Sequence, residues 1–300
     1  MTLKRNDTAL ILHLYYEDLW QEINSYLEKL LNFDLYITLT NNASDSIEQE
    51  IKLAYPNAYI YRLQNQGRDI RPFLVLLNDI NTEYKYYCKI HTKKSPQLVN
   101  GALWRTELLN ALLGSDVSVK KIKQALNVDY VGLVAPQKYI QLSEYCGPNQ
   151  SNIERLLTEL GIEAERPYQF EFTRGTMFWF NSAAADSLKA LIVYKESFEE
   201  ENGQLDGTLA HAIERIIFPL LDKSNLIYTD TEFLNKVVEN NNNKIDSYSI
   251  MKHNHSRMKH NHSRTISYLM SKKEHYNFTI LLGLFFKTFK KKLLNLINSN

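Results

Sequence analysis

Basic and acidic side chains gather just after a short apolar run, within residues 64–73. There Gly67 permits a tight turn with positive φ, and Arg68, Asp69 and Arg71 follow it at the start of a predicted helix. Guanidinium groups beside the exposed N–H groups of a helix start bind anions. We therefore predict an anion site here. The alternative is that Asp69 only caps the helix.

A second basic segment ends a Tyr-rich, strand-like run and contains Lys89, His91, Lys93 and Lys94. Strand alternation would place the first three on one face, where buried lysines are rare without partners. The pattern predicts a receptor for a diphosphate; the alternative is a solvated basic loop. Many nucleotide-sugar enzymes hold a divalent metal with an acid pair at this place. Because cations stand here instead, we expect no metal and no other cofactor.

Two further segments carry candidate side chains. Arg105 lies near the start of a predicted helix, where it opposes the helix dipole, so we expect it to have an anionic partner. Gly175, Thr176, Phe178 and Trp179 combine a glycine and a hydroxyl with aromatic rings. This combination is typical of a wall against which a sugar ring packs.

A late helix, predicted over residues 206–221, begins at an acid. Asp206 suits an N-cap, and a carboxylate at that end of the helix also suits a general base. His211 and Glu214 lie about one turn apart on the helix. We interpret both as packing or surface residues.

The elements that must position these residues alternate along the chain. Such alternation predicts an α/β fold with a mainly parallel twisted sheet and helices on both faces. Ligands of such sheets bind beyond the carboxyl ends of the strands, where the candidate residues lie. The predicted strands cover residues 9–14, 34–39, 58–62, 84–90, 128–135 and 175–180, and the predicted helices cover residues 17–33, 42–53, 70–80, 103–113 and 206–221.

Composition limits the class of protein. The 300 residues are 44% hydrophobic and 23% charged, as in a soluble globular chain, and the two cysteines fit a reducing compartment. We find no signal-peptide pattern and no apolar run of about 20 residues, so a cytoplasmic protein is expected.

The last sixty residues differ from the rest. Residues 251–257 are repeated identically at 258–264, which indicates a polar linker, with metal binding by its histidines as the alternative. We predict a main domain over residues 1–238, a His/Asn-rich linker over 239–275 and a basic amphipathic helix over 276–300.

Residues 244–300 hold 11 Lys/Arg and 2 Asp/Glu. The helix is expected to lie on a membrane surface, or else on the acidic body. That acidic body argues against nucleic acid.

Taken together, the segments resemble the rhamnan synthesis protein F family of bacterial polysaccharide glycosyltransferases. Their order and spacing extend the resemblance over residues 9–233. The matching segments are residues 65–73, 89–95, 101–105, 112–115, 175–179 and 206–215.

The resemblance implies a GT-A-like fold and transfer of a sugar, typically rhamnose, from a nucleotide-sugar donor to a growing cell-surface glycan. It implies that Asp206 is the base, and it suggests a lipid-linked acceptor at the inner face of the cytoplasmic membrane. We expect an inverting, metal-independent enzyme. The alternatives are a nucleotidyl- or phosphoryl-transfer enzyme and a non-catalytic module that binds glycans or nucleotide sugars. The residues expected at the donor are Arg68, Asp69, Arg71, Lys89, His91, Lys93, Lys94 and Arg105, and those at the acceptor are Gly175, Thr176, Phe178 and Trp179.

Overall fold

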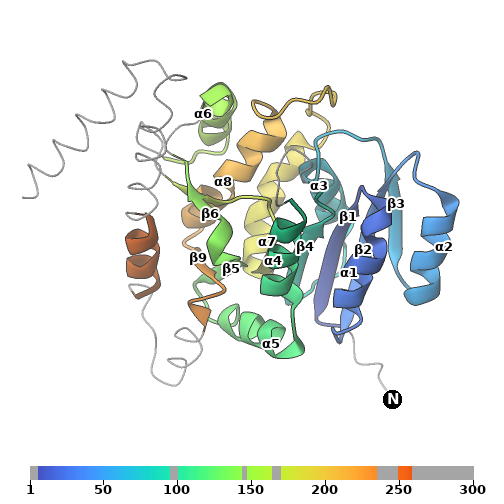
Figure 1. Ribbon diagram of the computed structural model, residues 1–300. Coiled ribbons are helices and arrows are strands. Elements are labelled where there is room, and N and C mark those ends of the chain that lie inside the picture. The colour runs from blue at the N-terminus through green and yellow to red at the C-terminus, as the bar shows by residue number, and fades with distance from the viewer. Residues whose placement is uncertain (1–5, 95–100, 144–146, 164–169, 235–248, 259–300) are drawn as a thin grey trace, which may run out of the picture. The chain divides into compact units, whose positions relative to one another are not determined.

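The computed structural model describes residues 6–94, 101–143, 147–163, 170–234 and 249–258. Its central sheet has seven strands in the order β3-β2-β1-β4-β8-β5-β9 (Figure 1). A separate pair, β6 and β7, is antiparallel. The strands are β1 Thr8–Leu14, β2 Phe33–Thr40, β3 Tyr59–Leu63, β4 Tyr86–His91, β5 Val131–Ala135, β6 Ile140–Leu142, β7 Glu171–Thr173, β8 Phe178–Asn181 and β9 Ile227–Asp230.

All strands of the large sheet except β8 run parallel to one another. β1 pairs in parallel with both β2 and β4, whereas β8 is antiparallel to its neighbours β4 and β5. The α/β class with a mainly parallel sheet is thus confirmed. The chain moves outward from β1 to β2 and β3 and then returns to the other side of β1 as β4. This reversal creates a switch point between β1 and β4, as in other doubly wound α/β sheets.

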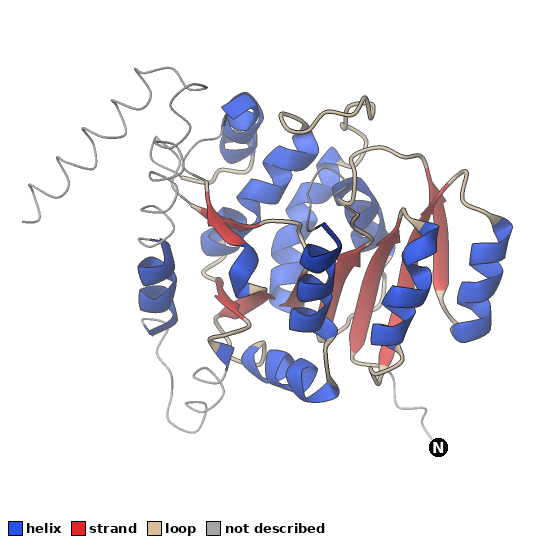
Figure 2. Ribbon diagram, in the orientation of Figure 1, coloured by secondary structure: helices blue, strands red, loops and turns tan. Residues whose placement is uncertain are grey.

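Helices cover both faces of the sheet (Figure 2). Ala9 and Ile11 of β1 pack in a cluster with α3, α6, α7 and α8, while Leu10 and Leu12 pack on the opposite face with α1, α2, α4 and α5. Both faces are apolar because side chains alternate along a strand that is covered on both sides. The α-helices are α1 Trp20–Leu27, α2 Asp45–Ala54, α3 Ile70–Asp79, α4 Gly101–Leu113, α5 Asp116–Ala125, α6 Gln150–Glu159, α7 Ser182–Leu188 and α8 Leu209–Lys223, and the 3₁₀ helices are η1 Glu17–Leu19, η2 Gln137–Tyr139, η3 Gly147–Asn149 and η4 Lys189–Tyr194.

Two predicted helices begin or end elsewhere. The helix expected over residues 17–33 ends at Leu27, because the chain must turn, with Asn32 at φ +59°, before β2 begins. The late helix starts at Leu209, and its N-cap is Thr208. The prediction that Asp206 caps this helix is therefore wrong. The hydroxyl of Thr208 instead hydrogen-bonds with His211 Nδ1 at 2.8 Å.

The chain divides into two compact units, residues 1–252 and 253–300. Residues 249–258, within the predicted linker, are helical, while the predicted amphipathic helix over 276–300 lies outside the described residues. Within the described parts of the chain, no helix has the length and apolar character needed to cross a membrane.

Candidate active site

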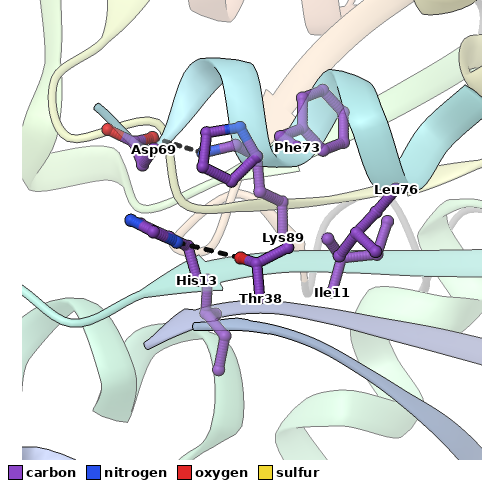
Figure 3. Close-up of a pocket in the computed structure, with 9 residues that line it drawn as sticks. Ile11, His13, Thr38, Asp69, Phe73, Leu76 and Lys89 are labelled. Carbon is purple, nitrogen blue, oxygen red and sulfur yellow. Dashed lines mark hydrogen bonds and ion pairs between the residues drawn. The ribbon is translucent and has the colours of Figure 1, made fainter. Parts of the chain in front are cut away.

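A buried ion pair lies at the switch point between β1 and β4. Lys89 of β4 is 1% exposed, and its Nζ lies 2.5 Å from Oδ2 of Asp69, at the start of α3 (Figure 3). Nζ also donates to the carbonyl and the hydroxyl oxygens of Thr176, at 2.8 and 3.1 Å, and the Thr176 hydroxyl donates to Asp69. The donors of Lys89 are thus all used within the protein.

These contacts correct two sequence-based interpretations. Lys89 was expected to face a diphosphate, but its side chain is buried between the sheet and α3. A buried lysine needs a close carboxylate to offset its loss of hydration. Asp69 makes no side-chain cap hydrogen bond, so it is not merely the helix cap that the alternative proposed. The pair joins α3, β4 and the turn before β8.

Two histidines lie beside this ion pair. Together with Lys89, Asp69 and Thr176 they form a group of side chains that we call the floor of the site. His91 Nδ1 lies 3.4 Å from Asp69 Oδ2, and His13 Nδ1 lies 2.9 Å from the Thr38 hydroxyl. Burial lowers the pKa of His91 to about 3 and that of His13 to about 4, so both rings are neutral at pH 7. Burial opposes ionisation of Asp69, yet its basic neighbours hold the pKa of that carboxyl well below its usual range. At neutral pH, Lys89 therefore supplies the positive charge.

The small pocket at this point has no space for even a water molecule. It is bounded by side chains of β1, β2, β4 and α3 (Figure 3), namely Ile11, His13, Thr38, Asp69, Pro72, Phe73, Leu76, Lys89 and Ile90. The floor thus positions neighbouring groups but leaves no room for a substrate.

We expect the protein to lose stability as the pH falls below about 6.5. His13 and His91 are neutral when folded, with pKa values of about 4 and 3, and regain an ordinary pKa near 6.5 when unfolded. The unfolded state then binds more protons, so acid favours it, by up to about 1.4 kcal/mol per pH unit for each histidine. Urea unfolding at pH 7.5 and 5.5 measures the effect. We expect a smaller loss for His91→Gln; an equal loss in both proteins would contradict this assignment.

Two cations without an acidic partner lie beside this floor. Lys93 Nζ lies 4.2 Å from the centre of the Trp104 ring, and Arg174 Cζ lies 4.6 Å from the same ring. Among the described residues, no carboxylate lies within 4.0 Å of either cation. Burial lowers the pKa of the Lys93 ammonium, and the more distant carboxylates of Asp69 and Glu214 only partly oppose that shift. Unpaired cations that share one aromatic ring are well suited to an anion.

Arg105 is buried beside Lys93 and holds the backbone of that residue. It is 8% exposed, and its Nη2 lies 2.7 Å from Glu22 Oε2. Its Nη1 donates to the carbonyl of Lys93 at 2.9 Å. The expected anionic partner is therefore Glu22, and Arg105 positions the Lys93 backbone. Its predicted contact with the donor does not fit this burial and pairing.

The other predicted donor residues already have acidic neighbours. Gly67, at φ +66°, makes the tight turn that its sequence context predicted, and Arg68 follows at φ +54°. Arg68 Nε is 4.0 Å from the Glu201 carboxylate, so this cation is only loosely paired. Two of the pairs are close: Lys94 with Asp18 at 2.7 Å and Arg71 with Glu196 at 3.2 Å.

Asp206 lies before α8 and is held by two donors. Its Oδ1 accepts from Asn149 Nδ2 at 2.7 Å and from Arg215 Nη2 at 3.3 Å. The side chain remains 38% exposed. His211 Nδ1 lies 4.0 Å away, and burial lowers the pKa of that ring to about 4. An accessible carboxylate held in a fixed orientation can accept a proton from a bound hydroxyl.

Sequence reasoning missed two residues, Arg174 and Glu214. Glu214 was interpreted as a packing or surface residue, but its Oε1 accepts the N–H of Gly175 at 2.8 Å. Burial raises the pKa of this carboxyl. The signal for Arg174 was a charge directly before a glycine in a segment already singled out. No comparable local signal marked Glu214, because α8 brings it to this turn from far along the chain.

The structure places the predicted acceptor residues in two environments. Gly175 and Thr176 form the turn before β8 and lie at the site. Phe178 and Trp179 are 0% and 1% exposed and pack on opposite faces of the sheet, so their predicted role against a sugar is corrected: they are core residues. Trp179 donates its indole N–H to the Leu112 carbonyl at 3.0 Å.

The strand order defines an α/β protein that, among its described residues, carries two cations without a close carboxylate beyond the carboxyl end of β4. The profile of the family described as Rhamnan synthesis protein F matches residues 1–225, and the chain belongs to this family. It is thus related to proteins of polysaccharide synthesis.

Two relatives named WxcX come from two strains of Xanthomonas campestris pv. campestris. They are 35% and 34% identical over 214 residues, which is 70% of this chain and 30% of each relative. The chain therefore spans less than a third of the length of these relatives. A crystal structure of 4-diphosphocytidyl-2C-methyl-D-erythritol synthase covers 76% of this chain and 89% of its own, with a TM-score of 0.37 and 9% identity.

Proposed function

We propose that the protein is a glycosyltransferase that moves a sugar, rhamnose or a similar hexose, from a nucleotide-sugar donor to a growing cell-surface glycan. Lys93 and Arg174 carry the proposal, because both lie against the Trp104 ring and neither has a carboxylate within 4.0 Å in the part of the chain that the structure describes. A donor diphosphate would supply the negative charge that this pair lacks. Membership of a family named for rhamnan synthesis supports the choice of a sugar as the group transferred.

A polar pocket beyond β1, β2 and β3 supports a nucleotide donor. It has a volume of about 200 Å³, and its lining offers hydroxyl, amide and carboxylate groups. Such groups match the hydrogen-bonding edges of a base and a ribose, and the ends of parallel strands are where α/β sheets bind nucleotides. The lining residues are Tyr15, Glu17, Thr40, Asn42 and Asn65.

In this mechanism, Asp206 removes the proton from the acceptor hydroxyl as that oxygen attacks the anomeric carbon. The bond from that carbon to the diphosphate breaks, and Lys93 and Arg174 stabilise the negative charge of the departing diphosphate. Inversion follows from a single displacement. The Asp69 carboxylate is already engaged by Lys89, which supports a reaction without a metal at this point.

Isothermal titration of nucleoside diphosphates, with and without EDTA, tests this donor site. Lys93→Met and Arg174→Met each remove a charge-assisted contact worth about 1.5–3 kcal/mol, so we expect binding to weaken by about tenfold or more. Lys120→Met is the matched control, because that lysine forms an exposed pair with Asp116 on α5. Unchanged binding in both site variants would contradict the assignment of the cations, and loss of wild-type binding in EDTA would contradict metal independence.

The acceptor and the place of action are also proposals. We propose a lipid-linked glycan as the acceptor and the inner face of the cytoplasmic membrane as the location, with residues 276–300 as the contact. The excess of basic over acidic residues after residue 243 supports binding to an anionic surface.

A further inference from the structure

Glu214 lies on the second turn of α8 and faces the turn that contains Gly175. The hydrogen bond from the Gly175 N–H fixes Oε1 at 2.8 Å. Gly175 has φ +93°, a conformation that other residues rarely adopt, and Thr176 beside it, at φ +43°, is held by Lys89 and Asp69. Glu214 is therefore anchored to a turn that the buried ion pair holds in place.

The second oxygen of this carboxylate lacks a donor. Among the described residues, nothing donates a hydrogen bond to Glu214 Oε2, and no basic nitrogen lies within 4.0 Å of the carboxylate. The acids nearby differ in this respect, since Asp69 pairs with Lys89 and Asp206 with Arg215. This oxygen is not one of the fully buried side-chain atoms that lack a partner, so it remains open to a hydrogen-bond donor supplied by a ligand.

The place next to Gly175 is bordered by the proposed anion site. A side-chain carbon built on Gly175 would lie 3.6 Å from Trp104 Cζ2 and 3.9 Å from Lys93 Cε, which are ordinary contacts rather than clashes. Lys93, the Trp104 ring and the Glu214 carboxylate thus surround this one glycine. A sugar linked directly to a diphosphate at Lys93 would carry its hydroxyl groups toward a nearby carboxylate.

The charges around Glu214 come from several elements. Arg215 lies on the same helix, Asp69 at the start of α3, Lys93 beyond β4 and Arg174 in the turn before β8. Burial raises the pKa of Glu214, and Asp69 raises it further, whereas Arg215 and Lys93 lower it. The net effect disfavours the ionised carboxylate, so a hydrogen-bond donor from a ligand would stabilise the ionised form.

We infer that Glu214 Oε2 accepts a hydrogen bond from a hydroxyl of the donor sugar, so that Glu214 helps to decide which sugar is transferred. This inference rests on the proposed function. It adds a specificity residue that contacts the sugar, distinct from the cations that contact the diphosphate and from the proposed base, Asp206.

Glu214→Gln tests the inference, because the amide oxygen still accepts the Gly175 N–H while the charge is lost. Asp222→Asn, an exposed position on the same helix, is the matched control. Each protein is titrated with a nucleotide sugar that the wild type binds and with the matching nucleoside diphosphate, and circular dichroism checks folding. We expect Glu214→Gln to bind the nucleotide sugar about tenfold to hundredfold more weakly, with unchanged affinity for the diphosphate.

Three other results would overturn the inference. Equal loss for both ligands means that Glu214 only supports the turn. Unchanged binding with a lower turnover number means that the carboxylate acts on the acceptor. Unchanged binding and turnover mean that it has no role in the site. Wild-type protein that binds no nucleotide sugar overturns the proposed function together with this inference, and is thereby distinguished from the other three.

Discussion

Lys89→Met is expected to lower the free energy of unfolding by about 3–5 kcal/mol. Methionine nearly matches the length of the lysine, but it leaves the Asp69 carboxylate, whose side chain is only 18% exposed, without its cation and removes two hydrogen bonds to Thr176. The cost comes from the uncompensated carboxylate, because an isolated charge in a buried place is far less stable than a paired one. Chemical denaturation of the variant and the wild type measures the difference.

The double variant Lys89→Met/Asp69→Asn separates this effect from simple loss of packing. Asparagine removes the negative charge, so the double variant should be more stable than Lys89→Met alone. Lys120→Met, which breaks an exposed pair with Asp116, should change stability by about 1 kcal/mol or less. If Lys89→Met were as stable as this control, the ion pair would not be what joins α3, β4 and the turn before β8.

Much of the fold was predictable from local patterns. The early strands are short apolar runs bounded by turn residues, and the structure contains each of them within a few residues of its predicted range. Less was predictable where tertiary contacts decide. α5, α6 and α7 and the short strands β6, β7 and β9 carry weaker patterns, and the antiparallel direction of β8 depends on how the chain returns across the sheet.

The site was predictable in its segments but not in its pairings. Sequence alone identified the basic end of β4, yet it gave no means of telling that Lys89 is neutralised by Asp69 while Lys93 has no carboxylate within 4.0 Å among the described residues. That difference depends on which strand faces which helix, and only the folded chain shows it. The aromatic pair Phe178 and Trp179 was misassigned for a related reason, since a strand covered on both faces buries consecutive residues.

Asp206→Asn is expected to lower the turnover number of sugar transfer by about 10²–10⁴-fold, the usual contribution of general-base catalysis. The amide oxygen can still accept from Asn149, so the segment before α8 should keep its conformation, and donor affinity should stay near that of the wild type. Asp186→Asn, at an exposed position that pairs with Lys189, is the matched control. Turnover at the wild-type rate would leave Asp206 with only the structural role of holding Asn149 and Arg215.

The most direct test of the account is the release of nucleoside diphosphate from a panel of nucleotide sugars, measured with and without a lipid-linked glycan acceptor. We expect the wild-type protein to release diphosphate from one class of donor, to do so faster with acceptor, and to lengthen the acceptor by one sugar for each diphosphate released. Binding of nucleotide sugar without release or transfer would contradict a glycosyltransferase and would favour a binding module of the polysaccharide assembly system.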